Sequence, residues 1–450
     1  MKIVLLSGCS GWRLWPLSNE ARSKQFLQLL QNEDGDYESM IQRIYRQICE
    51  AGMGEDVYVV TGGAQVDAIR SQIGWKAGII EEPSRRDTFP AVAMAAAFLA
   101  YEKCVSREET VLVLPVDTYV DNEYFEKLSC LDETLFQNTA DILLMGTKPT
   151  YPSAKYGYIL PGEKLPVSGN GADCLKVLRY VEKPSEEEAG ELLKRGALWN
   201  TGVFAFRLGF LTELLRKYTD AKDMQAFHAD FEKLPMKSFD YEILENHVYM
   251  AAIPYAGKWK DLGTWNTLTE EMSEENIGSA RQGESCVNTH VINELSIPVL
   301  VLGAKDMVVA ASPDGILVSD KHKSSFIKPY VQEMNIRPMY EERRWGEYKV
   351  LDYNQYDDET KSLTKHLMIR AGKSISYQKH YHRDEIWTIV DGVGELLIDG
   401  HVRNVRRGDV AYIVKGQLHA MRAVSDLQFI EVQIGAELSE DDIERFEWEW

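Results

Sequence analysis

This sequence of 450 residues lacks paired cysteines and long apolar runs. The six cysteines are scattered, with no Cys-x-x-Cys motif and no disulfide-dense spacing, which is typical of a reducing cytosol. The most apolar stretch, Ala91 to Tyr101, is alanine-rich and far shorter than the ~20 residues that span a bilayer, so it predicts a buried helix. No signal peptide precedes the first strand. We therefore expect a cytoplasmic protein that does not act on a membrane.

Basic residues are outnumbered, 50 Lys and Arg against 70 Asp and Glu, so the formal net charge is -20. Such a field argues against nucleic acid as a partner, since a polyanion needs a basic face. Anionic substrates must then be held by local cations. Apolar residues make up 44% of the chain, as in an ordinary globular protein, and the length allows two or three domains.

Up to about residue 270, short β-rich runs alternate with helical patterns. This alternation predicts an α/β fold with a mostly parallel sheet covered on both faces. Ligands bind such sheets outside the carboxyl ends of the strands. Ser185 and Glu188 also predict a capped helix through Lys194. The predicted strands are Ile3 to Leu6, Val57 to Thr61, Gly78 to Glu82, Thr110 to Leu114 and Ile142 to Thr147.

The pattern changes after residue 270. A polar linker leads into short strands interrupted by Gly, Pro and Asp, and from Arg344 onward strands recur every eight to twelve residues with glycine turns. The last part therefore predicts an antiparallel all-β barrel or sandwich. We divide the chain into residues 1–275, a small β segment at 276–338, and the barrel at 339–450.

The most informative stretch runs from Leu5 to Leu17 and is followed by Arg22-Ser-Lys-Gln-Phe26. Gly8 and Gly11 allow a tight turn with exposed N–H groups, and Arg13 and Lys24 supply cations. Together these features predict a phosphate site. The pattern is neither Gly-x-Gly-x-x-Gly nor a loop that ends in Gly-Lys-Ser/Thr. By itself, a glycine turn with a nearby Arg is also compatible with a plain connection between a strand and a helix.

This stretch resembles the N-terminal signature of the nucleotide-sugar pyrophosphorylases, and its Arg-Leu-Trp-Pro-Leu-Ser wording resembles the mannose-1-phosphate guanylyltransferase branch. Cys9 and Trp12 depart from that signature. The resemblance implies a Rossmann-like nucleotidyltransferase domain in which Gly8, Ser10 and Gly11 bind the nucleotide.

Two aspartates match the Mg²⁺-binding motifs of this family. Asp117 follows the strand at 110–114 in a Pro-x-Asp motif, and Asp261 begins Asp-x-Gly-x-Trp. Alone, an aspartate after a strand is more often a turn former. Mg²⁺ commonly takes one or two carboxylates together with substrate phosphates. The resemblance therefore implies that both aspartates bind Mg²⁺.

Other motifs resemble the substrate-binding residues of the family. Segment 82–90 resembles Glu-Pro-x-x-Arg-Asn-Thr-x-Pro, which favours GTP over pyrimidine nucleotides and implies that Glu82, Arg86 and Thr88 bind the nucleotide. On the sugar side, Glu182 and Asn200 would take hexose hydroxyls, Lys183 the sugar phosphate, and Gly157 a close approach of the backbone. The aromatic rings beside Gly157 and Asn200 are expected to be core or rim side chains.

In the C-terminal part, His380-x-His382 predicts two imidazoles on one face of a strand, because side chains alternate with period two. With Glu385, Gly392 and His419, the order resembles the two motifs of a cupin barrel. Glu385 can join the histidines if the chain bends near residues 383–384. His₃-carboxylate would suit Zn²⁺ or another first-row divalent metal. The segment also resembles the mannose-6-phosphate isomerase half of bifunctional enzymes, although its tail lacks their Tyr-Gly-Arg ending.

The resemblance implies transfer of GMP from GTP to α-D-mannose 1-phosphate, giving GDP-mannose and pyrophosphate. In this reaction Arg13 would stabilise the leaving pyrophosphate and Lys24 the α-phosphate. Three alternatives stay open: another base or hexose, a bifunctional enzyme that also isomerises mannose 6-phosphate, and a nucleotide-sugar sensor without turnover. We also expect a homo-oligomer, whose size the sequence does not determine.

Overall fold

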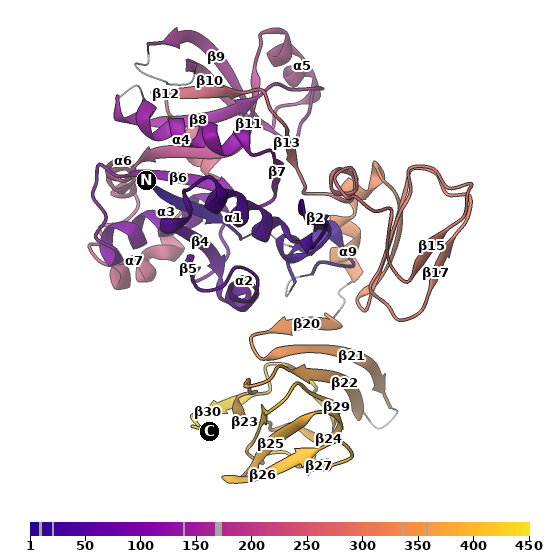
Figure 1. The fold of residues 1–450 in the computed structure, drawn as a ribbon. Coiled ribbons are helices and arrows are strands. Elements are labelled where there is room, and N and C mark those ends of the chain that lie inside the picture. The colour runs from indigo at the N-terminus through magenta and orange to yellow at the C-terminus, as the bar shows by residue number, and fades with distance from the viewer. Residues whose placement is uncertain (9–10, 20–21, 138–139, 167–172, 335–336, 357–358) are drawn as a thin grey trace. The chain divides into compact units, whose positions relative to one another are not determined.

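The computed structural model describes all residues except 9–10, 20–21, 138–139, 167–172, 335–336 and 357–358 (Figure 1). The chain forms two compact units. The first consists of Met1–Ser10 and Ser23–Ser273, and the second of Gly11–Arg22 and Glu274–Trp450. The N-terminal signature is therefore divided between them, with Lys24 in the first unit and Arg13 in the second. The boundaries at residues 275 and 338 stay predictions.

The first unit is built on a nine-stranded sheet. Its first four strands run parallel, and β11 then enters antiparallel to both of its neighbours. The predicted strands are all present, two of them with the predicted bounds. In spatial order the strands are β5 (Gly78–Glu82), β4 (Val57–Gly62), β1 (Lys2–Leu6), β6 (Thr110–Pro115), β11 (Leu198–Arg207), β8 (Ile142–Thr147), β12 (Met250–Tyr255), β10 (Cys174–Glu182) and β9 (Gly157–Leu165).

Alternating apolar side chains fill two cores, one on each face of this sheet. In β1, Val4 enters one core while Ile3 and Leu5 enter the other, as the period of two requires. The predicted two-sided α/β architecture is therefore confirmed. The Val4 core includes residues of α3 (Thr88–Ala97), α6 (Leu208–Leu215) and α7 (Met224–Asp230); the other includes residues of α1 (Met40–Glu50), α2 (Val66–Ile73) and α4 (Glu123–Phe136).

A short antiparallel pair extends the sheet's carboxyl edge: β7 (Thr118–Val120) pairs with β13 (Trp259–Asp261). The predicted helix, α5 (Glu186–Lys194), begins where the Ser185 side chain accepts a 3.2 Å hydrogen bond from the Glu188 N–H. None of the described helices is long and apolar enough to cross a membrane.

The second unit contains the small β segment and the barrel. The small segment forms one four-stranded sheet and one two-stranded parallel sheet, and α9 (Lys328–Met334) follows. The four-stranded sheet contains β14 (Asn276–Gly278), β16 (His290–Asn293), β18 (Met307–Ser312) and β19 (Gly315–Asp320), and the pair is β15 (Ala280–Gln282) with β17 (Val299–Val301).

The barrel confirms the predicted all-β end of the chain, because all its strand pairs are antiparallel. Trp387, Phe429 and Met421 belong to its core. One sheet contains β20 (Tyr340–Arg343), β21 (Gly346–Gln355), β22 (Lys361–Ile369), β29 (Leu427–Gly435), β24 (Arg383–Asp391) and β27 (Val410–Ile413); the other contains β26 (His401–Arg406), β25 (Val393–Ile398), β28 (His419–Ala423), β23 (Tyr377–Lys379) and β30 (Glu444–Phe446).

Candidate active site and metal centre

A cavity of about 190 Å³ opens in the first unit, beside the end of β6. Such a position is where α/β sheets bind ligands. Its lining includes Lys155, Tyr156 and Asp240, none of which the sequence analysis assigned to the site. Six predicted site residues also line it: Asp117, Gly157, Glu182, Lys183, Asn200 and Asp261.

The two predicted Mg²⁺ ligands are brought to one cavity although 144 positions separate them in sequence (261 minus 117). Asp261 pairs with Thr118 across β13 and β7, and the Leu262 N–H donates to the Asp117 carbonyl oxygen over 2.9 Å. A Cβ on Gly263 would lie 2.8 Å from the Asp261 carboxylate, so a larger residue there would displace that carboxylate from its present position. Two carboxylates facing a cavity are a donor set that suits Mg²⁺ bound to substrate phosphates.

Lys24 provides a buried cation beside this acidic pair. Its Nζ lies 2.6 Å from Asp117 Oδ2, and its side chain is only 4% exposed. The short turn of helix Lys24–Phe26, which follows the signature segment, fixes this position. Lys24 therefore neutralises part of the acidic charge at the cavity.

Backbone geometry explains Gly157. A Cβ on this residue would lie 2.5 Å from the Glu182 carboxylate and closer still to the Tyr180 hydroxyl, because β9 and β10 pair Gly157 with Glu182. Lys183 Nζ lies 2.8 Å from Glu182 Oε1. Lys183 has a φ of 45°, a conformation that few non-glycine residues adopt.

A break in the pairing of β11 with β8, between Asn200 and Phe204, presents Asn200 to the cavity. Its Oδ1 accepts from the Gly202 N–H over 3.2 Å, and its Nδ2 donates to Asp240 Oδ1 over 2.9 Å. Burial and the neighbouring Glu182 carboxylate raise the pKa of Asp240 to about 6. In the sequence, Asp240 is an acidic residue followed by a tyrosine and belongs to no recognised motif, so nothing there indicated that it lines the cavity.

On the nucleotide side, the structure brings together Gly8 and Glu82. A Cβ on Gly8 would lie 3.3 Å from Glu82 Oε2. Burial raises the pKa of Glu82 to about 7, although Arg85 opposes the shift. The side chains of Arg86 and Thr88 form hydrogen bonds with the backbone of a later segment. Arg86 donates to the Leu234 carbonyl over 3.1 Å, and Thr88 Oγ1 accepts from the Phe239 N–H over 2.9 Å.

The rest of the signature lies in the second unit. Arg13 is exposed on the short 3₁₀ helix Gly11–Leu14, and Gly11 is buried where a Cβ would clash with the Asn19 carbonyl. Ser10 lies outside the described residues. The nucleotide-binding roles of Ser10, Gly11 and Arg13 stay predictions.

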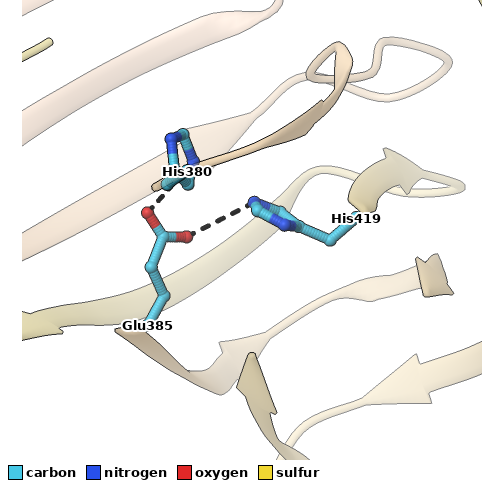
Figure 2. Close-up of side chains that lie close together, drawn as sticks. All are labelled: His380, Glu385 and His419. Atoms are coloured by element: carbon cyan, nitrogen blue, oxygen red, sulfur yellow. Dashed lines mark ion pairs between the residues drawn. The ribbon is translucent and has the colours of Figure 1, made fainter. Parts of the chain in front are cut away.

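A second candidate site lies inside the barrel, where His380, Glu385 and His419 converge (Figure 2). His380 Nε2 lies 3.3 Å from Glu385 Oε1, and His419 Nε2 lies 3.5 Å from Glu385 Oε2. Each imidazole uses Nδ1 to donate to a backbone carbonyl, of Asp442 and Gln417 respectively, so each Nε2 turns a lone pair toward the carboxylate. Burial lowers the pKa of both histidines, which favours their neutral forms.

This arrangement fits a metal ion. His419 Nε2 is buried and has no hydrogen-bond partner in the described part of the chain. Arg383 Nη2 lies 3.3 Å from His380 Nε2, whereas the His419 Nε2 lone pair faces the Glu385 carboxylate, and a bound metal ion would relieve that repulsion. The Nδ1 hydrogen bonds orient the rings as ligands require. Arg383 also neutralises the carboxylate, donating to Glu385 Oε1 over 2.9 Å.

The structure does not bring His382 to this cluster. The prediction assumed a continuous strand, but β23 ends at Lys379 and β24 begins at Arg383, so the two histidines lie in a connection without period-two alternation. His382 is exposed, and its N–H donates to Asp442 Oδ2 over 3.1 Å. Gln378, the cross-strand partner of His419, instead places Nε2 3.4 Å from His380 Nε2. The spacing Gln378-x-His380-x₄-Glu385 is the sequence signal that was missed.

The fold and its family-model matches define an α/β nucleotidyl transferase, joined here to an isomerase-type barrel. Residues 2–276 match the nucleotidyl transferase family model, and residues 333–448 match the model of the mannose-6-phosphate isomerase C-terminal domain. The chain therefore belongs to the nucleotidyl transferase family.

Its relatives match over nearly their whole length. An alginate biosynthesis protein from Pseudomonas putida is 31% identical, covering 99% of this chain and 95% of the relative. A mannose-1-phosphate guanylyltransferase from Salmonella montevideo is 29% identical, covering 98% of both chains. Among solved structures, a mannose-1-phosphate geranyltransferase from Thermus thermophilus is similar, with a TM-score of 0.61 and 28% identity, covering 74% of this chain and 98% of that one.

Proposed function

We propose that this protein transfers GMP from GTP to α-D-mannose 1-phosphate, giving GDP-mannose and pyrophosphate. The observation that carries the proposal is the single cavity where Asp117 and Asp261 meet Glu182, Lys183 and Asn200. Full-length similarity to guanylyltransferases supports the choice of substrates.

A sugar-phosphate oxygen attacks the α-phosphorus of GTP in line, and the bond from that phosphorus to the bridging oxygen breaks as pyrophosphate leaves. Asp117 and Asp261 would hold Mg²⁺, which when bound neutralises phosphate charge. Lys24 forms an ion pair with Asp117 and stabilises the charge of the α-phosphate, while Arg13 stabilises the departing pyrophosphate. Positioning and charge neutralisation supply most of the acceleration.

The remaining residues bind the two substrates. Glu182 accepts hydrogen bonds from hexose hydroxyls, Asn200 forms hydrogen bonds with further hydroxyls, and Lys183 binds the sugar phosphate. The described cysteines are all free thiols, as in a reducing cytosol. The proposal includes a cytoplasmic homo-oligomer that uses neither nucleic acid nor a membrane. Gly8, Gly11 and Ser10 would hold the nucleotide with Glu82, Arg86 and Thr88.

The test is a coupled pyrophosphate-release assay with GTP and mannose 1-phosphate. Asp261→Asn removes one proposed Mg²⁺ ligand and should lower kcat/KM by about 100-fold or more, as does the loss of a group that stabilises transition-state charge. Arg13→Ala should also lower turnover. Asp34→Asn, in an exposed turn, is the matched control and should leave the rate unchanged. Normal rates in both Asp261→Asn and Arg13→Ala would refute the assignment.

The same assay separates the alternatives. A panel of nucleoside triphosphates and sugar 1-phosphates identifies another base or hexose. Tight binding of GDP-mannose without pyrophosphate release would instead identify a sensor.

A second activity in the barrel is favoured by the buried His380, Glu385 and His419 cluster and by the isomerase-type domain match. We propose that this cluster, with Gln378 beside it, holds Zn²⁺ or another first-row divalent metal and supports interconversion of mannose 6-phosphate and fructose 6-phosphate. The conversion should be abolished by a chelator, while a chelator-insensitive or absent conversion would contradict this second function.

A further inference from the structure

The buried Tyr180 hydroxyl lies between two carboxylates, those of Glu182 and Asp240, that line the cavity. Its oxygen is 2.9 Å from Glu182 Oε2 and 2.6 Å from Asp240 Oδ1, and it accepts from Asn200 Nδ2 over 3.0 Å. A hydroxyl has one proton, so it can donate to only one of the two carboxylates at a time. This wall therefore has more hydrogen-bond acceptors than protein donors.

The two carboxylates differ in how many of their oxygens accept a hydrogen bond from the protein. Both oxygens of Glu182 have partners, since Tyr180 reaches one and Lys183 Nζ the other. Asp240 receives Tyr180 and Asn200 on Oδ1, and its own backbone N–H also approaches its carboxylate, but among the described residues no side chain donates to Oδ2. Because Asp240 lines the cavity, a ligand there can supply the missing donor.

The fixed position of Asp240 suits a binding role. It begins the π-helix Asp240–Leu244, and the Glu182 backbone N–H donates to Glu245, at the end of the same helix, over 2.9 Å. The two carboxylates are therefore held by connected elements. A buried carboxylate beside another is costly when ionised, and this cost falls when further donors reach it.

We propose that Asp240 is a second sugar-binding carboxylate, whose Oδ2 accepts a hydrogen bond from one hydroxyl of the hexose 1-phosphate, with Tyr180 and Asn200 as its positioning residues. This inference rests on the proposed function and adds to it. A hydrogen bond to a charged acceptor contributes about 10- to 100-fold in binding. A site built for a hydroxyl rejects an analogue that lacks it, because the buried acceptor is left without a partner.

The test combines Asp240→Asn with deoxy analogues of mannose 1-phosphate. The substitution keeps an accepting oxygen for Tyr180 and Asn200 and replaces the other oxygen with an amide donor. We expect kcat/KM for mannose 1-phosphate to fall about 10- to 100-fold, mainly through KM, while the KM for GTP stays unchanged. For the one analogue that lacks the contacted hydroxyl, variant and wild type should react at similar rates.

An equal loss for every analogue would show that Asp240 acts only on the structure, and would overturn the inference while leaving the proposed function intact. If the wild-type protein turns over no hexose 1-phosphate, the proposed function and the inference both fail. If Asp240→Asn does not fold, the same analogue panel is measured with Asp240→Glu, which keeps the charge but displaces the carboxylate oxygens. Tyr180→Phe, which removes the bridging hydroxyl, should weaken sugar binding with less dependence on the analogue.

Discussion

At the scale of single residues, the cavity depends on where side chains are absent as much as on where they are present. Gly157 makes room for the Tyr180 hydroxyl and the Glu182 carboxylate, and Gly263 makes room for Asp261. Family motifs indicated Gly157, yet Tyr180, which lies against it, and Asp240, which contacts Tyr180, were not predictable, because they come from separate elements that only folding brings together.

We predict that Gly157→Ala impairs sugar binding, because the added methyl group overlaps two polar groups held in a packed wall. Displacement of this kind costs about 1–3 kcal/mol, so the KM for mannose 1-phosphate should rise by about 5- to 150-fold. Steady-state kinetics measures the effect.

The matched control is Gly190→Ala in α5, where no atom lies within 4 Å of the added Cβ. This change should leave KM unaltered and stabilise the helix by about 0.5–1 kcal/mol. An unchanged KM in Gly157→Ala would show that the wall adapts to the methyl group.

At the scale of elements, strand ends decide which polar residues meet. The strands of the α/β unit were predictable because short apolar runs alternate with helical patterns along the chain. The helix after Ser185 was predictable because its cap is local. The break between β23 and β24 was not predictable from alternation, and it determines which of His380 and His382 faces the barrel interior.

We predict that the purified protein holds one divalent metal per barrel, and that His419→Ala loses it while His382→Ala retains it. The reason is that His419 Nε2 faces Glu385, whereas the His382 side chain is exposed. Elemental analysis of the protein after dialysis measures the metal content. Loss of metal in His382→Ala, or its retention in His419→Ala, would contradict the cluster as described.

At the scale of the whole molecule, the signature segment belongs to two compact units. Residues Gly11–Arg22 pack within the second unit: Ser312 Oγ donates to the Pro16 carbonyl over 2.7 Å, and Asn19 Nδ2 donates to Asp314 Oδ2 over 2.5 Å. Asp314 Oδ1 accepts from the Met339 N–H over 2.6 Å. The Asp314 carboxylate therefore connects the segment that carries Arg13 with the residues that precede the barrel, through one hydrogen bond to each.

We predict that Asp314→Asn weakens GTP use, because its new amide cannot satisfy the Asn19 and Met339 donors together. Loss of one such bond costs on the order of 1–2 kcal/mol and should raise the KM for GTP by about tenfold. Kinetics with varied GTP tests this prediction, with the exposed Glu333→Gln as the control. A KM equal to that of the control would mean that the segment holds its conformation without this anchor.

The sequence alone determined the α/β alternation, the all-β end and the order of the motifs, because periodicity and capping depend on neighbours along the chain. Tertiary structure alone decided that Asp117 and Asp261 share a cavity, that Asp240 joins Glu182 there, and that Gln378 rather than His382 lies beside His380. Those outcomes depend on strand register and on where strands end, which packing between distant segments sets.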